Sequence, residues 1–185
     1  MSKNNSLNER EINLAFVDVE ATGLSINHEI IEIGVILVSQ PNFEIIEEWE
    51  RKTKPKRIKD ADPEALNLVG YTEKEWENAV ELKLALAEFL EKVNGAIIIG
   101  HNISWDLMWL RKALFENGFG EKFARRSFDL FTIAYAKLLD KAQEIKYFSL
   151  SNLARYFSIN EPQKHRALAD CRTAYEVFKK LMEIK

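Results

Sequence analysis

The sequence predicts one α/β domain built on a mixed β-sheet. Three apolar runs before residue 53 are separated by short polar links, which is typical of an antiparallel meander. A fourth apolar run, 96–100, lies between two amphipathic helical stretches, and this alternation of helix and strand is typical of an α/β fold. The 185 residues, of which 46% are hydrophobic and 30% charged, suffice for a single domain with a sizeable core.

Each expected element follows from a local pattern. Residues 1–11 are polar and predict a disordered lead-in, which leaves 12–185 as the domain. Apolar and β-branched runs predict strands at 13–20, 30–38, 43–52 and 96–100. Apolar residues at helical spacing predict helices at 82–93, 104–117, 129–139 and 149–157, and a last one that begins near residue 165 or 166. A short helix is expected at Pro63, where Asp62 can cap the N-terminus.

Charge and cysteine content exclude several classes of protein. A net charge of −3 does not suit a bulk nucleic-acid binder, so an enzyme acting on nucleic acid would need metal ions or a local basic surface. The single cysteine, Cys171, excludes a disulfide framework and a cysteine-based zinc site, and it fits a reducing cytoplasm. The polar N-terminus is not a signal peptide, and no run is long enough to span a membrane, so no membrane partner is expected.

Six of the nine residues in 51–59 are basic. Two interpretations stay open for this basic run. It can protect an edge strand with lysines and a proline, or it can form a rim that contacts phosphates. Trp49, Trp76 and Trp109 are expected in the core, and the oligomeric state stays open.

The first strand carries two carboxylates in an otherwise apolar run. Asp18 and Glu20 are two residues apart, so both side chains point to the same face of the strand. Burying two adjacent carboxylates costs several kcal/mol unless something positive compensates, and a divalent metal ion does so. The alternative is a strand that ends in a solvated turn with both acids exposed.

Three more polar residues stand near predicted helix starts. Asp106 falls in the first turn of the helix after the strand at 96–100, Asp170 lies beside the apolar stripe of the last helix, and His165 precedes it. Five residues on a helix turn through about 140°, so His165 can share a site with Asp170 only in or before the first turn. Each has a simpler interpretation: Asp106 could offset the helix dipole, and the other two could lie on the surface.

Taken together, these residues indicate a metal-dependent hydrolase. Four carboxylates are oxygen ligands that suit Mg²⁺ or Mn²⁺ rather than zinc, and a pair of such ions about 3.5–4 Å apart can clamp both oxygens in phosphodiester cleavage. A histidine that titrates near neutral pH suits the activation of water. A zinc hydrolase is set aside, because the three histidines include no His-x-x-x-His pair.

Three motifs in order resemble the DEDD 3′–5′ exonucleases, in the DnaQ-like, histidine-type branch that includes the proofreading exonuclease of bacterial DNA polymerase III. The motifs are Asp18-Val19-Glu20-Ala21-Thr22-Gly23-Leu24 followed by Ile30-Ile31-Glu32-Ile33-Gly34, then His101-Asn102-Ile103-Ser104-Trp105-Asp106, and then His165-Arg166-Ala167-Leu168-Ala169-Asp170. The resemblance covers about 13–182. Arg166 stands where the tyrosine-type branch carries its tyrosine, whereas His165 fits the histidine type.

The resemblance implies a ribonuclease H-like sheet, with strands 1–3 antiparallel and later strands parallel, flanked by helices. It implies two Mg²⁺ or Mn²⁺ ions held by Asp18, Glu20, Asp106 and Asp170, with His165 as the base that prepares water for attack. The substrate would be a single-stranded 3′ end of DNA or RNA, released as nucleoside 5′-monophosphates. Residues implied to contact it are Thr22, Gly23, Leu24, Glu64, Asn102 and Trp105.

Three departures from the family pattern concern the substrate. Ala21 replaces a common threonine, Trp105 replaces a common phenylalanine, and Val69 stands where the proofreading subunit has a histidine. Val69 weakens the case for the proofreading subunit itself. The resemblance still implies roles in replication and proofreading with a DNA polymerase as partner, or action alone. The alternative is a catalytically silent module of the same fold that binds nucleic acid or a polymerase.

Overall fold

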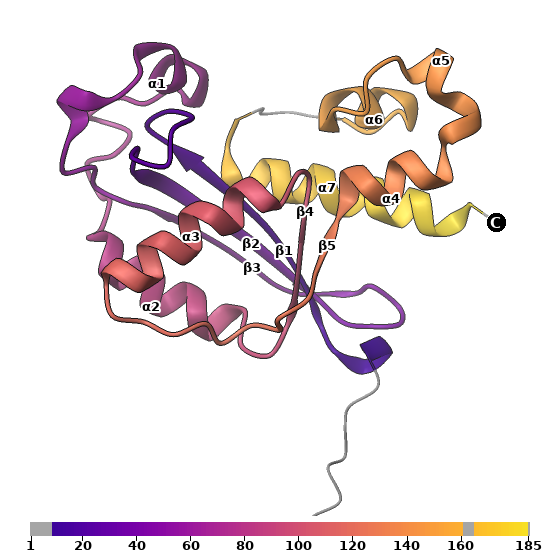
Figure 1. Ribbon diagram of the computed structural model, residues 1–185, viewed down its shortest axis with the longest axis horizontal. Coiled ribbons are helices and arrows are strands. Elements are labelled where there is room, and N and C mark those ends of the chain that lie inside the picture. The colour runs from indigo at the N-terminus through magenta and orange to yellow at the C-terminus, as the bar shows by residue number, and fades with distance from the viewer. Residues whose placement is uncertain (1–8, 161–164, 185) are drawn as a thin grey trace, which may run out of the picture.

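A five-stranded mixed sheet forms the centre of the protein (Figure 1). The structure is a computed structural model and describes residues 9–160 and 165–184. The strands lie in the order β3-β2-β1-β4-β5, with bounds β1 Leu14–Ala21, β2 Ile30–Val38, β3 Ile45–Lys52, β4 Ile97–Gly100 and β5 Ser127–Asp129. β1, β2 and β3 are antiparallel, whereas β4 and β5 run parallel to β1. The predicted mixed sheet is confirmed.

Helices cover both faces of this sheet. One face packs against α2 (Leu82–Lys92) and α3 (Ser104–Glu116), and the other against α4 (Leu130–Lys137), α6 (Leu150–Tyr156) and α7 (Ala167–Glu183) (Figure 1). The short helix α1 (Pro63–Val69) lies near the β1–β2 loop, and α5 (Ala142–Ile145) lies between α4 and α6. Asp62 caps α1 as predicted, because its side chain accepts a hydrogen bond from the Glu64 amide.

The alternation of side chains along β1 supplies both halves of the core. Ala15 and Val17 belong to the cluster under α2 and α3, whereas Leu14 and Phe16 belong to the cluster under α4 and α7. Phe16 is fully buried and lies edge-on to two aromatic rings of α7, with ring centroids 5.5 Å apart. Because both faces are covered, the strand is apolar at almost every position.

Two short elements differ from the predictions. β5 has only three residues, at positions where the sequence predicted a loop and the start of a helix, and Asp129 instead caps α4. A run of three residues carries too little periodicity to reveal a strand, and β5 exists because β4 offers it a parallel partner. In the lead-in expected to be disordered, Glu9–Glu11 form a short 3-10 helix, and residues 1–8 lie outside the described residues.

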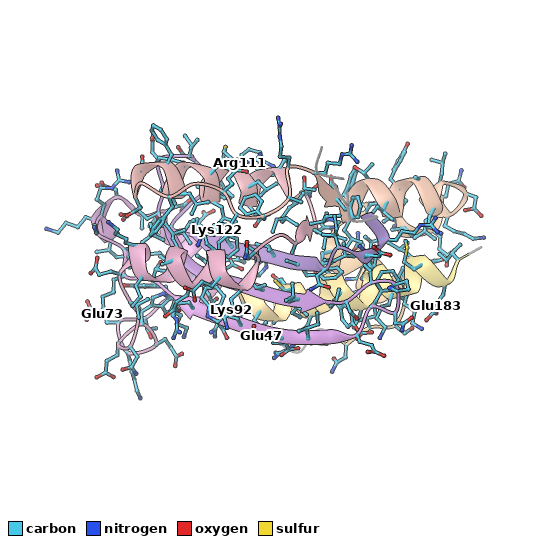
Figure 2. All side chains as sticks on the ribbon, turned by 90° about the horizontal axis from the view of Figure 1, so that it is seen from below. Glu47, Glu73, Lys92, Arg111, Lys122 and Glu183 are labelled. Atoms are coloured by element: carbon cyan, nitrogen blue, oxygen red, sulfur yellow. The ribbon has the colours of Figure 1, made fainter. Side chains whose placement is uncertain are left out.

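The exposed edge of the sheet is covered by charge pairs. Glu47 on β3 lies beside Lys92 at the end of α2, and the two form an ion pair (Figure 2). Four side chains of the basic run also face carboxylates: Arg51 pairs with Glu88, Lys52 with Glu75, Lys56 with Glu81 and Arg57 with Glu29. These pairs favour edge protection over a phosphate rim as the role of the run.

The tryptophans at 49, 76 and 109 are buried, as predicted. Within 9–160 and 165–184, no helix combines the length and the apolar character that crossing a bilayer requires.

Candidate active site

Asp18 and Glu20 lie at the carboxyl end of β1, the central strand of the sheet. They alternate with the residues that face α2 and α3, so both side chains lie on the face covered by α7. Both are partly buried, which excludes a fully solvated turn. Central strand ends are where α/β sheets gather their ligands.

Asp106 and Asp170 reach the same point from two helices. Asp106 lies in the first turn of α3 and is only 7% exposed; its Oδ1 accepts a hydrogen bond of 2.9 Å from the Val19 amide on β1. Asp170 lies in the first turn of α7, and its Oδ2 accepts a 3.1 Å hydrogen bond from the His165 amide. The starts of α3 and α7 thus bring Asp106 and Asp170 to the end of the strand that carries Asp18.

His165 meets the geometric condition set by its spacing. α7 begins at Ala167, so His165 lies before the first turn, with φ of 57° in the left-handed region that few non-glycine residues adopt. Potential ligand atoms of Glu20, His165 and Asp170 all lie within 4.8 Å of one another. The unusual backbone therefore coincides with a cluster of possible metal ligands.

The electrostatics of the cluster call for a cation. Burial, followed by repulsion from Asp106, Glu20 and Asp170, raises the pKa of Asp18 well above its usual range. Burial and the neighbouring carboxylates raise the pKa of Glu20 to about 8, and burial raises that of Asp106 to about 7. A divalent cation would relieve both causes, since it replaces lost hydration and offsets the repulsion. Carboxylate oxygens fit a hard ion such as Mg²⁺ or Mn²⁺.

A buried ion pair holds the start of α7 against β2. Glu32 is completely buried and accepts three hydrogen bonds from the Arg166 guanidinium, at 2.9 to 3.2 Å, and it also accepts one from the Ala167 amide. Arg166 extends to Glu50 on β3 at 3.1 Å. Burial alone would raise the pKa of Glu32, but hydrogen bonds from Glu50 and Arg166 outweigh it and lower the pKa.

The role of this Glu32–Arg166–Glu50 network was missed by the sequence reasoning. A signal was present: Glu32 interrupts a strand that is otherwise apolar, and a buried carboxylate requires a partner. The identity of the partner could not be read from the sequence, because Arg166 is 134 residues away.

Gly34 allows α7 to approach the sheet closely. A Cβ atom at this position would lie 2.5 Å from the carbonyl carbon of Ala167 and 2.6 Å from the Leu168 nitrogen, both backbone atoms. Only a residue without a side chain fits here. Gly34 on β2 pairs with Asp18 on β1. It therefore sets how closely α7, which carries Asp170, approaches the sheet beside Asp18.

The β1–β2 loop carries the predicted contacts at 22–24. Thr22 is buried, and its backbone and hydroxyl bond to Glu29 and to the Asp62 amide, so it shapes the loop. Gly23 packs on the His28 ring, where a Cβ atom would lie 2.4 Å from Cε1. Leu24, in contrast, is 80% exposed.

The other three predicted substrate contacts are exposed. Trp105, in the first turn of α3, is 56% exposed and lies 6.2 Å from the Trp109 ring, whose indole nitrogen donates to the Ser25 carbonyl in the β1–β2 loop. Asn102 lies in the turn before α3 with φ of 57°, which asparagine tolerates, and its amide donates to Asp129. Glu64 lies on α1, which the Asp62–Thr22 bond ties to the same loop.

Comparison with known proteins decides the family. Residues 15–178 match the exonuclease family, RNase_T. The chain belongs to this family. The match confirms the resemblance to the exonucleases and identifies the chain as an exonuclease domain. Nearly the whole described fold lies inside the matched region.

Curated relatives of this exonuclease domain include DNA polymerases III of the PolC type. The chain is 29% identical over 168 residues to the polymerase of Caldanaerobacter subterraneus subsp. tengcongensis, covering 90% of the chain and 11% of the polymerase. It is 31% identical over 171 residues to that of Staphylococcus aureus, covering 91% and 11%. The chain therefore spans about a tenth of the length of these relatives.

Solved structures share the fold of this exonuclease domain. E. coli exonuclease I in complex with a dT13 oligonucleotide has a TM-score of 0.79 at 19% identity, covering 94% of the chain and 41% of that protein. The nuclease domain of 3′hExo, a DEDDh family member bound to rAMP, has a TM-score of 0.75 at 16% identity, covering 92% of each. The predicted ribonuclease H-like fold is thereby confirmed.

Proposed function

We propose that this exonuclease domain hydrolyses the terminal phosphodiester of nucleic-acid 3′ ends and releases nucleoside 5′-monophosphates, using two Mg²⁺ or Mn²⁺ ions. The observation that carries the proposal is the convergence of four carboxylates, three of them with a raised pKa, on one partly buried point beside His165. The structural relative bound to dT13 supports a single-stranded substrate.

Different residues would bind the metal ions, activate water and bind the substrate. Asp18, Glu20, Asp106 and Asp170 would hold the ions, which when bound supply positive charge that lowers the pKa of water and stabilises developing charge on the phosphate. His165 lies beside Glu20 and Asp170, where its imidazole can accept the proton of the attacking water. The exposed Leu24 and Trp105 would receive the terminal nucleotide beside the backbone of Thr22 and Gly23. Asn102 and Glu64 would contact the 3′ end.

The test compares carboxylate variants with a matched control. Asp18→Asn and Asp106→Asn should each abolish nucleotide release from a labelled single strand with Mg²⁺ and keep the fold, because each removes a ligand charge. Asp140→Asn changes an aspartate whose side chain is 72% exposed and should retain full activity. Undiminished release by the Asp18 and Asp106 variants would overturn the assignment.

The same assay separates the enzyme from a silent binding module. If the wild-type chain binds no Mg²⁺ or Mn²⁺ and leaves DNA and RNA strands intact, the silent module is the correct interpretation. Matched DNA and RNA oligonucleotides, labelled at either end, also show which polymer is preferred and which end shortens.

We further propose that the domain serves proofreading during DNA replication in the cytoplasm, in association with a DNA polymerase. The support is its similarity to a segment of bacterial DNA polymerases III. Co-purification with a polymerase would support this role, and full activity with no such association would favour an enzyme that acts alone.

A further inference from the structure

An exposed group of aromatic rings lies on α4 and on the loop that precedes α6, near the candidate active site. Phe131 is 37% exposed, Tyr135 48% and Tyr147 77%. We call these three residues the aromatic platform. Large exposed apolar side chains that gather in one place mark a binding surface more often than scattered ones do.

The sheet places the aromatic platform beside the candidate active site. The last parallel pair of β1 and β4 is Phe16 and Ile99, so Asp18 lies two residues beyond this pair on β1, and His101 lies two residues beyond it in the turn that follows β4. The His101 ring packs edge-on against Phe131, with centroids 6.2 Å apart. His101 therefore connects the end of β4, the neighbour of the strand that carries Asp18, to the first ring of the platform.

Two of the three rings, Phe131 and Tyr135, pack against each other and against a buried ring. Phe131 and Tyr135 are one helical turn apart on α4, with centroids 6.2 Å apart and planes inclined by only 18°. The buried Phe148 packs edge-on against both of them from below, at 6.5 and 5.5 Å. Tyr147 immediately precedes Phe148, and its carbonyl accepts a hydrogen bond of 2.9 Å from the Asn152 side chain on α6. Rings that are already held by packing in the free protein lose little entropy on binding.

We propose that the aromatic platform stacks the unpaired bases of a single-stranded substrate, upstream of the nucleotide that is cleaved. This inference rests on the proposed function of the adjacent site. Single-strand binders combine aromatic rings for the bases with cations for the backbone, and each base offers a flat face whatever its identity. Lys146, exposed beside Tyr147, supplies such a cation.

The overall charge favours this mode of binding. The net charge is −3, and four of the six cations of the basic run pair with carboxylates, so the overall electrostatic attraction for a long strand is weak. Stacking gives affinity that does not depend on phosphate contacts. A base-paired duplex hides the base faces, so the platform selects single strands over blunt duplexes.

The experiment measures binding separately from cleavage. All proteins carry Asp106→Asn to prevent hydrolysis, and fluorescence anisotropy with Mg²⁺ gives the Kd for a labelled dinucleotide, a labelled dT8 and a blunt duplex. Tyr135→Ala and Tyr147→Ala should each weaken dT8 binding about tenfold, the effect of losing one stacked base, and leave the dinucleotide Kd unchanged. Tyr135→Phe keeps the ring and should bind dT8 normally.

The matched control is Phe115→Ala, which removes an aromatic ring that is 85% exposed near the end of α3. It should not change any Kd. The proposal is overturned if Tyr135→Ala and Tyr147→Ala bind dT8 like the Phe115→Ala control, or if they weaken the duplex as much as the single strand. Failure of the proposed function would be detected by a different experiment, the nucleotide-release assay with the wild-type chain.

Discussion

Removing the Arg166 side chain tests how the start of α7 is held. In Arg166→Ala, Glu32 loses the three hydrogen bonds from the guanidinium and keeps those with Glu50 and with the Ala167 amide, the latter at 3.3 Å. The Glu32 side chain is 0% exposed, so the loss of the guanidinium leaves a buried carboxylate without an opposite charge. Breaking a buried pair from one side costs about 3–5 kcal/mol.

The lower end of that range applies, because the Arg166 side chain is itself 25% exposed. We expect the free energy of unfolding to fall by about 3 kcal/mol, which corresponds to a decrease in Tm of about 6–12 °C for a chain of this size. Typical domains have about 5–15 kcal/mol of stability, so the variant should still fold. Its nucleotide release should decline more than its folded fraction does, because Ala167 leads directly into the helix with Asp170.

Urea unfolding followed by circular dichroism at pH 7.5 measures the effect, and a double variant controls it. Glu32→Leu with Arg166→Met replaces the pair by apolar groups of similar size and should cost about 1 kcal/mol or less, because no charge remains unpaired in the core. A cost of less than about 1 kcal/mol for Arg166→Ala would refute the reasoning. So would a double variant whose cost equals the sum of its two single variants.

Three other predictions concern the acids, the close contact of α7 and the basic run. The pKa of Glu20 is raised to about 8 and that of Asp106 to about 7, so without metal their ionisation destabilises the folded protein. The free energy of unfolding is therefore unaffected below about pH 4 and falls as the pH rises toward 8. Tm in EDTA should fall over that range, and Mg²⁺ should restore it most at pH 8. Gly34→Ala forces a Cβ into the backbone of α7 and should cost about 1–3 kcal/mol in urea unfolding, together with most of the nucleotide release. Lys54→Glu with Lys56→Glu should leave KM within about twofold, since the structure favours edge protection for this run; a large rise in KM at low salt would show a phosphate rim instead.

Much of the fold was predictable because its elements are long and regular. The strand at Ile30–Val38 and the helix at Leu82–Lys92 follow from their apolar periodicity, and the cap at Asp62 follows from its position before a proline. β5 was not predictable, because its three residues carry no period of their own and depend on pairing with β4.

The candidate site shows a similar division. Asp18, Glu20, Asp106, His165 and Asp170 stood out as polar groups in or beside apolar surroundings, and the structure brings them to one point. The Glu32–Arg166–Glu50 network that holds the start of α7 was not predictable. A carboxylate in an apolar strand indicates that a partner is needed, but it does not indicate which residue is the partner.

The assembly of the acidic cluster from distant parts of the chain also constrains when catalysis can begin. Asp18 arrives with the first strand, but Asp170 and His165 arrive only with α7, which docks on β1 and β2. A partly synthesised chain on the ribosome, still without α7 and the residues just before it, lacks Asp170 and His165, two of the five residues of the candidate site. Under the proposed function, a chain whose synthesis has not yet passed α7 is therefore not an active nuclease, because α7 supplies Asp170.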